Sequence, residues 1–600
     1  MGVDTSSSNF ANQMTGKLEC SRRTFLAAGA VGALSGATGS SIVKASGITG
    51  EQAESVQSSG SRFEQPGNPT RGAERAWAVA EYDHLKQMRE GAAQQGNSSG
   101  GNQSGSGLGS PTSPNFSNVV NAVDDLGADP TGGRAISQDL GSAIKPDTLI
   151  LFPPGEYLLD QEWGVSVDGT FGMAGEGYKQ ASSPLESGKN AATFVAADNT
   201  RAAINFEAET GLLANFVLDQ TGNRNSISIL LRSSGFVQAR DIRYVGTQDN
   251  TGSQADEDQS NPMCRFAADE GATARAERLI GKHIGLPGDK NSGGAPFFWV
   301  GESNKGTAQM GNCVSVGAAD NGLYGGRTPG HAQVKGGKYV NNAVSQLRYD
   351  GAESWADGVS MVVDADNYSG PTNGTPYNEK FGVQGLKTER RKYQEKKPSG
   401  AVLRNADVRV RSINSNMGAP IYIRGWAGSL KIENSRIVNQ LDQTTIRAEA
   451  PGDGNPATQP PHNITITDSE IVSSYADPVI DIRERENSSI RNTCIKVPGA
   501  GPSSINGMDI GENVGFGKQC NKGGLSAPDK VGASGNLSAV NFSAMDSGNG
   551  SSGEDAQQRQ QQRKQKFFQR VISVIFSMFL LIALVVVGAV ATLFYLIFGD

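Results

Sequence analysis

The chain has little of what most metal and nucleotide sites require. Its 600 residues include 4 His and 5 Cys, and aromatic residues make up only 7%. No Cys-X-X-Cys spacing, metal-binding His pair or phosphate loop occurs, and none of the His residues precedes a Gly. These absences argue against a zinc site of the common structural type and a nucleotide-binding loop.

Strong charge of either sign is also lacking. The net charge is −7, and Lys and Arg are scattered rather than gathered in a stripe, so nucleic acid is excluded as a partner. What the chain does have is glycine, with 77 residues, together with much Asn and Ser. This composition favours short strands separated by turns over long helices.

Both ends carry targeting patterns. Residues 1–45 contain Arg22-Arg23 before a weakly apolar segment that ends in small residues, and they resemble a twin-arginine signal peptide. The resemblance implies export through the twin-arginine machinery after folding. Residues 571–598 contain no charged side chain and predict one C-terminal transmembrane helix. The basic residues before that helix would favour a cytoplasmic body, but an export signal overrides this, so we expect an anchored protein at the cell surface or envelope.

The polar segments between these patterns divide the rest of the chain. Residues 46–115 predict one short helix followed by a Gly/Ser/Asn linker, and residues 521–570 predict a flexible stalk with a basic flank. The folded body is therefore expected over residues 116–520.

The body repeats one pattern of apolar alternation interrupted by Asn or Asp. It is clearest in "VLRNADVRVRS", "LKIENSRIVNQ", "ITITDSEIVSS" and "SSIRNTCIKVP", where Asn405, Asn434, Asp468 and Asn492 are 29, 34 and 24 residues apart. Such spacing suits coils of three short strands and three turns, and it predicts an all-β, parallel β-helix. Leu430, Ile432 and Ile437 would form one core layer, with Asn434 at a turn. The alternative is an antiparallel sandwich, which would require tight hairpins.

The start of the body adds a family resemblance. "LGA" at Leu126–Ala128 and "FPPGEY" at Phe152–Tyr157 flank a helix-like "RAISQDLGSAI". This arrangement resembles the entry of the pectate-lyase-like right-handed parallel β-helix superfamily, although "GADPTGG" replaces a more usual acidic stretch. The resemblance implies an N-terminal capping helix within residues 134–144.

Four cysteines follow the signal segment. Among three possible connectivities we predict disulfides between sequence neighbours, Cys264 with Cys313 and Cys494 with Cys520, with buried free thiols as the alternative.

Candidate site residues gather between 320 and 366. The catalytic candidates supply carboxylates, an imidazole and a guanidinium: Asp320, His331, Arg348, Asp350 and Asp357. Tyr324 and Trp355 could stack on a sugar, and Asp364 and Asp366 are weak candidates for a cation site. The competing interpretation is that these are ordinary turn residues of coils.

Two function classes remain. The first is a membrane-anchored extracellular β-helix protein that binds glycans or other surface ligands, as an adhesin, envelope component or virion spike. The alternative, which the resemblance implies, is a polysaccharide lyase or glycoside hydrolase, with Ca²⁺ as a possible cofactor if it is a lyase. A polysaccharide or cell-surface glycan is the expected partner in both classes.

Overall fold

The computed structural model describes residues 114–520 except 115, 139, 179–190, 223–224, 249–260, 286–294, 371–382, 391–399, 415–417, 455 and 518–519. The predicted signal at 1–45, the segment up to residue 113, the stalk at 521–570 and the transmembrane helix at 571–598 lie outside this part of the chain. Within it, no helix is long and apolar enough to span a membrane.

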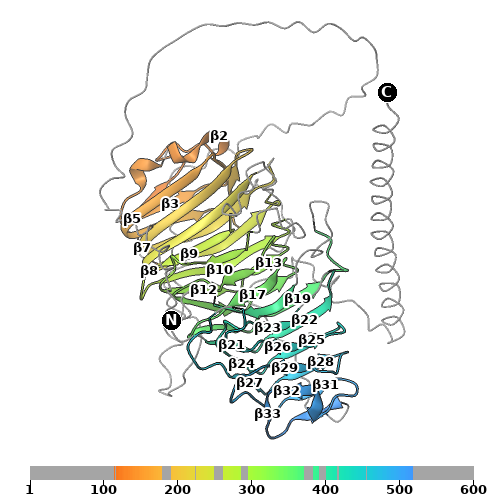
Figure 1. The fold of residues 1–600 in the computed structure, drawn as a ribbon. Coiled ribbons are helices and arrows are strands. Elements are labelled where there is room, and N and C mark those ends of the chain that lie inside the picture. The colour runs from red at the N-terminus through yellow and green to blue at the C-terminus, as the bar shows by residue number, and fades with distance from the viewer. Residues whose placement is uncertain are drawn as a thin grey trace, which may run out of the picture. The chain divides into compact units, whose positions relative to one another are not determined.

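Parallel strands wind around one axis and form three walls (Figure 1). The walls are numbered in the order in which the chain crosses them within a coil. Wall 1 contains β9 (Cys264–Ala268), β11 (Phe298–Val300), β14 (Leu323–Gly325), β17 (Ser345–Tyr349), β20 (Gln384–Thr388), β23 (Ile421–Ile423), β26 (Ile446–Ala448), β29 (Ile480–Ile482) and β32 (Ile505–Asn506).

Walls 2 and 3 follow the same parallel order. Wall 2 contains β1 (Asn118–Asn121), β3 (Thr148–Phe152), β12 (Thr307–Gly311), β15 (His331–Lys335), β18 (Ser354–Asp357), β21 (Gly400–Arg404), β24 (Ser429–Glu433), β27 (Ile464–Thr467), β30 (Ser489–Arg491) and β33 (Asp509–Ile510). Wall 3 contains β2 (Thr131–Ala135), β4 (Gly155–Leu159), β6 (Ala192–Ala196), β13 (Val314–Val316), β16 (Lys338–Val340), β19 (Ser360–Asp364), β22 (Asp407–Ser412), β25 (Arg436–Asn439), β28 (Glu470–Ser473), β31 (Cys494–Lys496) and β34 (Gly515–Phe516).

Four longer strands bend around corners and so belong to more than one wall. They are β5 (Glu162–Gly175), β7 (Arg201–Asp219), β8 (Ser226–Val245) and β10 (Thr273–Lys282). The predicted parallel β-helix with three strands per coil is therefore confirmed, and the antiparallel sandwich is excluded for the described residues.

The core consists of apolar side chains stacked coil on coil. In wall 2 the inward residues Leu403, Ile432, Ile466 and Ile490 are register partners in turn, and none is exposed. Ile437 of wall 3 is equally buried, which confirms that it and Ile432 belong to one core layer. Stacking in register removes each apolar side chain from water on both sides, which is the main stabilising contribution to such a coil.

The interrupting Asn and Asp residues occupy the turn between walls 2 and 3. Asn405, Asn434, Asp468 and Asn492 have φ values of 50°, 44°, 53° and 47°. Asn and Asp adopt this left-handed conformation more readily than other non-glycine residues, which explains their recurrence at this position. The Asn434 amide also donates to Oδ1 of Asn405 in the preceding coil at 2.7 Å. The prediction of Asn434 as a turn residue is confirmed.

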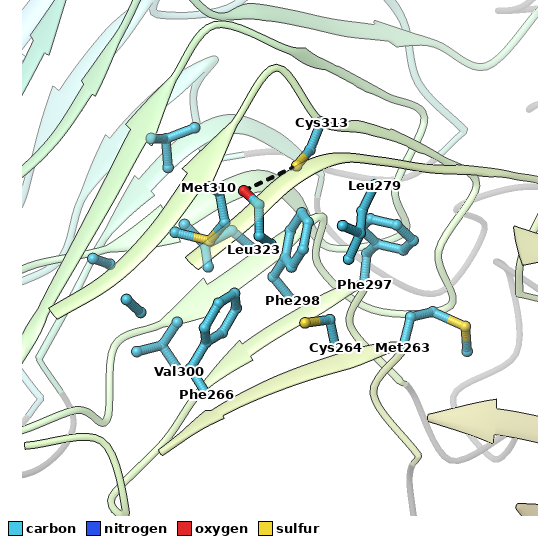
Figure 2. Packing of buried hydrophobic residues seen from close by; sticks show 14 of the residues in the cluster. Met263, Cys264, Phe266, Leu279, Phe297, Phe298, Val300, Met310, Cys313 and Leu323 are labelled. Atoms are coloured by element: carbon cyan, nitrogen blue, oxygen red, sulfur yellow. Dashed lines mark hydrogen bonds between the residues drawn. The ribbon is translucent and has the colours of Figure 1, made fainter. Parts of the chain in front are cut away.

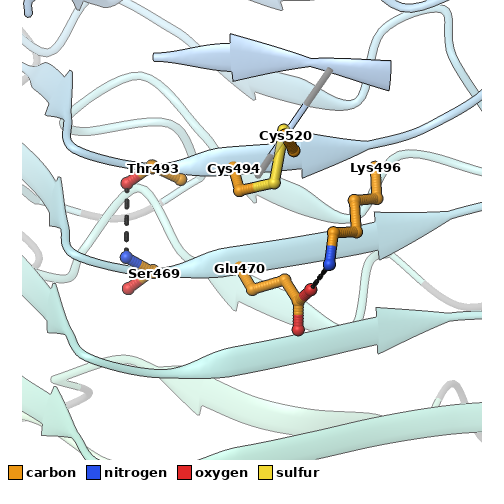
Figure 3. The surroundings of a disulfide bond; sticks show 6 residues. All are labelled: Ser469, Glu470, Thr493, Cys494, Lys496 and Cys520. Atoms are coloured by element: carbon orange, nitrogen blue, oxygen red, sulfur yellow. Dashed lines mark hydrogen bonds and ion pairs between the residues drawn. A yellow bond between two sulfur atoms is a disulfide. The ribbon is translucent and has the colours of Figure 1, made fainter. Parts of the chain in front are cut away.

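Hydroxyl groups join these turns from coil to coil. Backbone N–H groups of Ala406, Ser435 and Ser469 donate to the hydroxyls of Ser435, Ser469 and Thr493 at 3.1, 3.2 and 3.5 Å. Figure 3 shows the last of these contacts beside the ion pair between Glu470 and Lys496. Each turn therefore satisfies a backbone donor of its neighbour, as buried amides require.

The predicted capping helix is wrong. The segment forms the end of β2, then two short 3-10 turns at Ile136–Gln138 and Gly141–Ala143. Because β2 already pairs with β4 in the first coil, only a short crossing remains to be covered. The two turns place Ile136, Leu140 and Ala143 against the core, so they close its end without an α-helix.

One predicted disulfide is confirmed and one is wrong. Cys494 of β31 is bonded to Cys520, which lies beyond the last strand (Figure 3). Cys264 and Cys313 are free and buried. Cys264 enters the core from wall 1, whereas Cys313 lies at the turn between walls 2 and 3, and Figure 2 shows the two thiols at separate places among the aromatic side chains. Burial raises the pKa of both thiols, that of Cys313 to about 12.

The left-handed turn predicts a difference between two substitutions. We expect Asn434→Ala to lower the free energy of unfolding by about 1 kcal/mol more than Asn434→Gly, because Ala resists a positive φ and Gly does not. Both variants lose the amide contact to Asn405, so the comparison isolates backbone conformation. Urea unfolding of the two variants measures it, and equal losses would contradict this explanation.

The cysteine arrangement predicts a labelling pattern. In the folded chain an alkylating reagent should leave Cys264 and Cys313 unmodified, because both are buried and protonated at neutral pH. After denaturation without reductant, peptide mass analysis should find both modified, while Cys494 and Cys520 remain linked to each other. A linked peptide joining Cys264 to Cys313 would overturn the assignment.

Candidate functional site

A row of large polar and aromatic side chains runs down the outer surface of wall 1. In each strand the apolar neighbours of the row residue point inward, as with Leu347, Leu386 and Ile421, so the row residue points outward. The register aligns these positions in successive coils. The wall 1 row consists of Trp299, Tyr324, Arg348, Lys387, Tyr422, Arg447 and Asp481.

The upper part of the row is an aromatic and guanidinium cluster. The Trp299 and Tyr324 rings meet edge to face with centroids 4.9 Å apart. The guanidinium of Arg348 lies 4.1 Å from the Tyr324 centroid, and Arg327 lies within 6 Å of both rings and donates to the Tyr324 hydroxyl at 3.2 Å. These cation–π contacts leave Tyr324 only 5% exposed.

A buried carboxylate bridges the two adjacent cations of the row. Arg348 and Lys387 are register partners one coil apart. Glu389, whose side chain is 1% exposed, forms ion pairs with Arg348 and, at 3.4 Å, with Lys387 Nζ. The carboxylate lowers the repulsion between the cations, and they stabilise its charge in return.

Two titratable groups beside this bridge have shifted pKa values. Burial, reinforced by the charge of Arg348, lowers the pKa of Lys387 to about 8. Burial also raises the pKa of Asp320 to about 6, against the attraction of Arg348, Lys387 and Arg327. Asp320 immediately precedes wall 1 and is half-buried. The pKa values of this amine and of the nearby carboxyl group therefore both lie close to neutral pH. General acid–base catalysis requires such pKa values.

The predicted site residues separate onto two walls. Asp320, Tyr324 and Arg348 meet at wall 1, while His331 and Trp355 lie on wall 2. His331 Nδ1 is 2.6 Å from the Ala352 carbonyl oxygen, and its Nε2 is 3.6 Å from Glu353. Trp355 has the Arg404 guanidinium 5.3 Å from its ring centroid. The two predicted sugar-stacking residues, Tyr324 and Trp355, therefore do not share a surface.

Asp357 belongs to a charge network on wall 2. Its oxygens lie 2.7 Å from Lys335 Nζ, 3.1 Å from Arg404 Nε and 2.7 Å from the Asn405 amide nitrogen. Although burial opposes it, the hydrogen bonds from Lys335 and Asn405 and the nearby charges hold the pKa of Asp357 below its usual value. A carboxylate so fully paired links three coils and is not free to accept a proton from a substrate.

Asp350 lies inside the corner between walls 1 and 2. It is 2% exposed, and its carboxylate accepts the backbone N–H groups of Gly351, Gly400 and Gly428 at 2.6, 2.9 and 3.0 Å. Burial raises its pKa, although these amides oppose the shift. The three amides belong to three successive coils, so Asp350 holds the corner together and does not reach the wall 1 surface.

Arg485 binds backbone carbonyl groups at the same corner, where Asp350 binds backbone N–H groups. Its guanidinium donates to backbone carbonyls of Arg424, Ala427, Gly428, Glu449 and His462. Burial lowers its pKa to about 10. Because Gly428 gives its N–H to Asp350 and its carbonyl to Arg485, the two buried charges connect five successive coils.

The weak cation candidates do not form a metal site. Asp364 is buried, and its oxygens contact Asn367 at 2.9 Å, Ser412 at 3.2 Å and Arg411 at 3.3 Å. Asp366 is exposed and does not join it. Within the described residues no group of three or more His, Cys, Asp or Glu side chains could hold a metal ion. These residues therefore do not fit Ca²⁺.

Sequence reasoning missed Lys387 and Glu389, as well as a second cluster lower on wall 1. There the Arg424 guanidinium lies 4.2 Å from the Trp426 centroid and 5.3 Å from that of Tyr422, and it forms a 3.2 Å ion pair with Glu449. A signal existed in the sequence. Each row residue follows an inward apolar residue, as in Leu323-Tyr324, Leu347-Arg348, Leu386-Lys387, Ile421-Tyr422, Ile446-Arg447 and Ile480-Asp481.

No protein-family model and no curated protein matches the chain in sequence. The decisive observation is the parallel register of three walls over successive coils. The fold is a parallel β-helix. The predicted parallel β-helix architecture is therefore confirmed.

Several solved structures are similar to it. The Agl-KA catalytic domain is 10% identical, with 68% of this chain and 69% of that chain covered and a TM-score of 0.42. The A-module of the Azotobacter vinelandii mannuronan C-5 epimerase AlgE6 is 12% identical, with 66% and 99% covered and a TM-score of 0.37. Pectate lyase Pel9A is 13% identical, with 66% and 78% covered and a TM-score of 0.20.

The corner carboxylate predicts a loss of stability that is independent of any activity. Asp350→Asn should lower the free energy of unfolding by about 2–3 kcal/mol, because an amide nitrogen replaces one acceptor and leaves buried N–H groups unpaired. Asp453→Asn, at an exposed turn residue, is the matched control and should change little. Urea unfolding measures both variants, and equal midpoints would contradict the structural role of Asp350.

Proposed function

We propose that the chain acts on an acidic polysaccharide at wall 1 and cleaves it by β-elimination. The single observation that carries this proposal is the wall 1 cluster in which Glu389 bridges the register partners Arg348 and Lys387. Beside this bridge, burial lowers the pKa of Lys387 to about 8 and raises that of Asp320 to about 6. Arg348 and Arg327 add positive charge around them, which suits a substrate that carries carboxylates. The proposed reaction class is that of a polysaccharide lyase.

The roles follow from the protonation states. The neutral amine of Lys387 takes the proton from the ring carbon beside the substrate carboxylate. The bond from the neighbouring carbon to the glycosidic oxygen breaks, a carbon–carbon double bond forms, and Asp320 donates its proton to the departing oxygen. Arg327 has no ion-pair partner among the described residues, so its guanidinium is available to neutralise the substrate carboxylate. Exchange of protons with water restores both groups.

Hydrolysis is less well supported, because it requires two accessible carboxyl groups. Asp320 could serve as one. Glu389 is almost fully buried and paired with two cations, Glu449 is held by Arg424, and Asp481 is held by Arg483 at 3.1 Å. Among the described residues of wall 1, a second carboxylate able to activate water is therefore missing.

Binding without turnover is the second candidate. It is favoured by the contact between the half-buried side chains of Arg327 and Trp299, whose guanidinium and ring centroid lie 5.7 Å apart and form a cationic and aromatic surface. We also propose an exported location, anchored at the cell surface, on the basis of the predicted signal and transmembrane segment. The disulfide between Cys494 and Cys520 is consistent with an oxidising compartment.

Turnover by the whole chain on polyuronates provides the test. We expect unsaturated products, detected by their ultraviolet absorbance, and a loss of at least about 100-fold in kcat for Lys387→Ala. Lys387→Arg is the matched control, since it keeps the charge and binding but has no amine that titrates near neutral pH.

The pH profile distinguishes the two roles. Below about pH 6 the rate should fall because Lys387 is increasingly protonated, and above about pH 8 because little Asp320 retains its proton. In Asp320→Asn the maximal rate should be lower, but the decline above pH 8 should disappear. Binding of polyuronates with no product from any of them would leave the binding-only candidate and reject the lyase.

A further inference from the structure

Arg447 differs from Arg348, Arg424 and Arg483 of wall 1. Arg348 is paired with Glu389, Arg424 with Glu449, and Arg483 with Asp481. The half-buried Arg447 forms no hydrogen bond or ion pair with a described residue, and its buried Nε has no hydrogen-bond partner. Removing part of a guanidinium from water without a counter-charge is unfavourable, so this side chain is suited to an anion supplied from outside.

The register fixes the distance of Arg447 from the proposed catalytic lysine. Lys387 pairs with Tyr422, and Tyr422 pairs with Arg447, so two coils separate the two cations. Neighbouring strands lie about 4.8 Å apart, which gives about 10 Å between their Cα atoms. This spacing is roughly that of two sugar rings. The half-buried Tyr422 lies between them as an aromatic surface for the intervening ring.

The surrounding charges leave Arg447 available. Tyr422 donates its hydroxyl to Glu449, whose other oxygen accepts the N–H of Gly425 at 2.8 Å. On the other side of Arg447 in the row, Asp481 accepts hydrogen bonds from Arg483. Both nearby carboxylates are thus already engaged, and neither compensates Arg447.

We propose that Arg447 binds a second anionic group of the polysaccharide, two coils away from Lys387. This inference rests on the proposed function, because it assumes an acidic glycan along wall 1. A guanidinium can form paired hydrogen bonds with either a carboxylate or a sulfate, so the shared chemistry is a planar or tetrahedral oxyanion. Arg447 then determines specificity for chains long enough to reach it.

Binding of defined oligomers tests the proposal apart from catalysis. The whole chain carrying Lys387→Ala is titrated with digalacturonate and tetragalacturonate, with and without Arg447→Gln. We expect Arg447→Gln to weaken tetragalacturonate binding by about tenfold or more, because a charge-assisted hydrogen bond is lost, and to leave digalacturonate nearly unchanged. Arg447→Lys should retain part of the affinity. Arg491→Gln, at an exposed arginine of wall 2, is the matched control.

Further probes distinguish the sources of the anion. Dextran sulfate and polygalacturonate are compared, with dextran as the neutral control, and the polymer whose affinity depends more on Arg447 identifies the preferred group. Equal effects of Arg447→Gln and Arg491→Gln on the acidic probes would overturn the role of Arg447. So would the absence of binding of the chain to every acidic probe.

The two proposals fail in different ways. If Arg447→Gln, in a chain that retains Lys387, turns over substrate with an unchanged KM, the anion-binding role of Arg447 is rejected and the lyase proposal is kept. Arg447-dependent binding with no unsaturated product would reject the lyase and keep Arg447. Urea unfolding of Arg447→Gln and Arg447→Lys verifies that a lost affinity does not arise from a lost fold.

Discussion

The parallel register between successive coils is the constraint on which the rest of the structure depends. It places each paired strand residue directly beside its counterpart in the next coil, inside and outside the wall alike. Inside, this produces continuous rows of Val, Ile and Leu that exclude water. Outside, it holds Arg348 beside Lys387, two like charges that a flexible chain would separate. The lowered pKa of Lys387 is therefore a consequence of strand pairing together with burial.

Two buried charged groups lie at the corner between walls 1 and 2, where the backbone leaves the walls. Asp350 accepts three amides and Arg485 donates to five carbonyls, so each compensates backbone groups that no strand can pair. Glu389 has a related position beside wall 1 but is compensated by side-chain cations. The corner charges therefore stabilise the backbone, whereas Glu389 stabilises cations on a wall to which a ligand could bind.

The fold could be predicted from the sequence because its signal is local and repeated. A positive φ selects Asn or Asp at residues such as Asn434, and strand alternation marks Ile432 as inward. The disulfide between Cys494 and Cys520 was also accessible, since both residues lie at the last coils. The free state of Cys264 and Cys313 could not be predicted, because their separation along the chain does not show from which wall each side chain enters the core. The capping helix was wrong because β2 takes up part of the expected segment.

The candidate site was harder to predict because the sequence does not show which wall each side chain belongs to. Asp350 and Trp355 are close to Arg348 in sequence, but the chain turns a corner between them, so the three side chains point in different directions. Lys387, one coil later in the chain, is the spatial neighbour of Arg348. Residues that cooperate on a β-helix surface are separated by whole coils, and the loops between coils vary in length. Only the register, which the sequence does not state, brings them into one row.

The turn between walls 2 and 3 has a further consequence. In the coils that contain Asn405, Asn434, Asp468 and Asn492, a two-residue turn joins strands of walls 2 and 3, although the intervals between these residues differ. All variation in coil length is therefore absorbed at the other two corners, which border wall 1. Because this turn has the same length in these coils, a complete coil could be added, deleted or exchanged at it. The strand register of the remaining coils would not change. Wall 1 could change its chemistry coil by coil while the scaffold keeps its pitch.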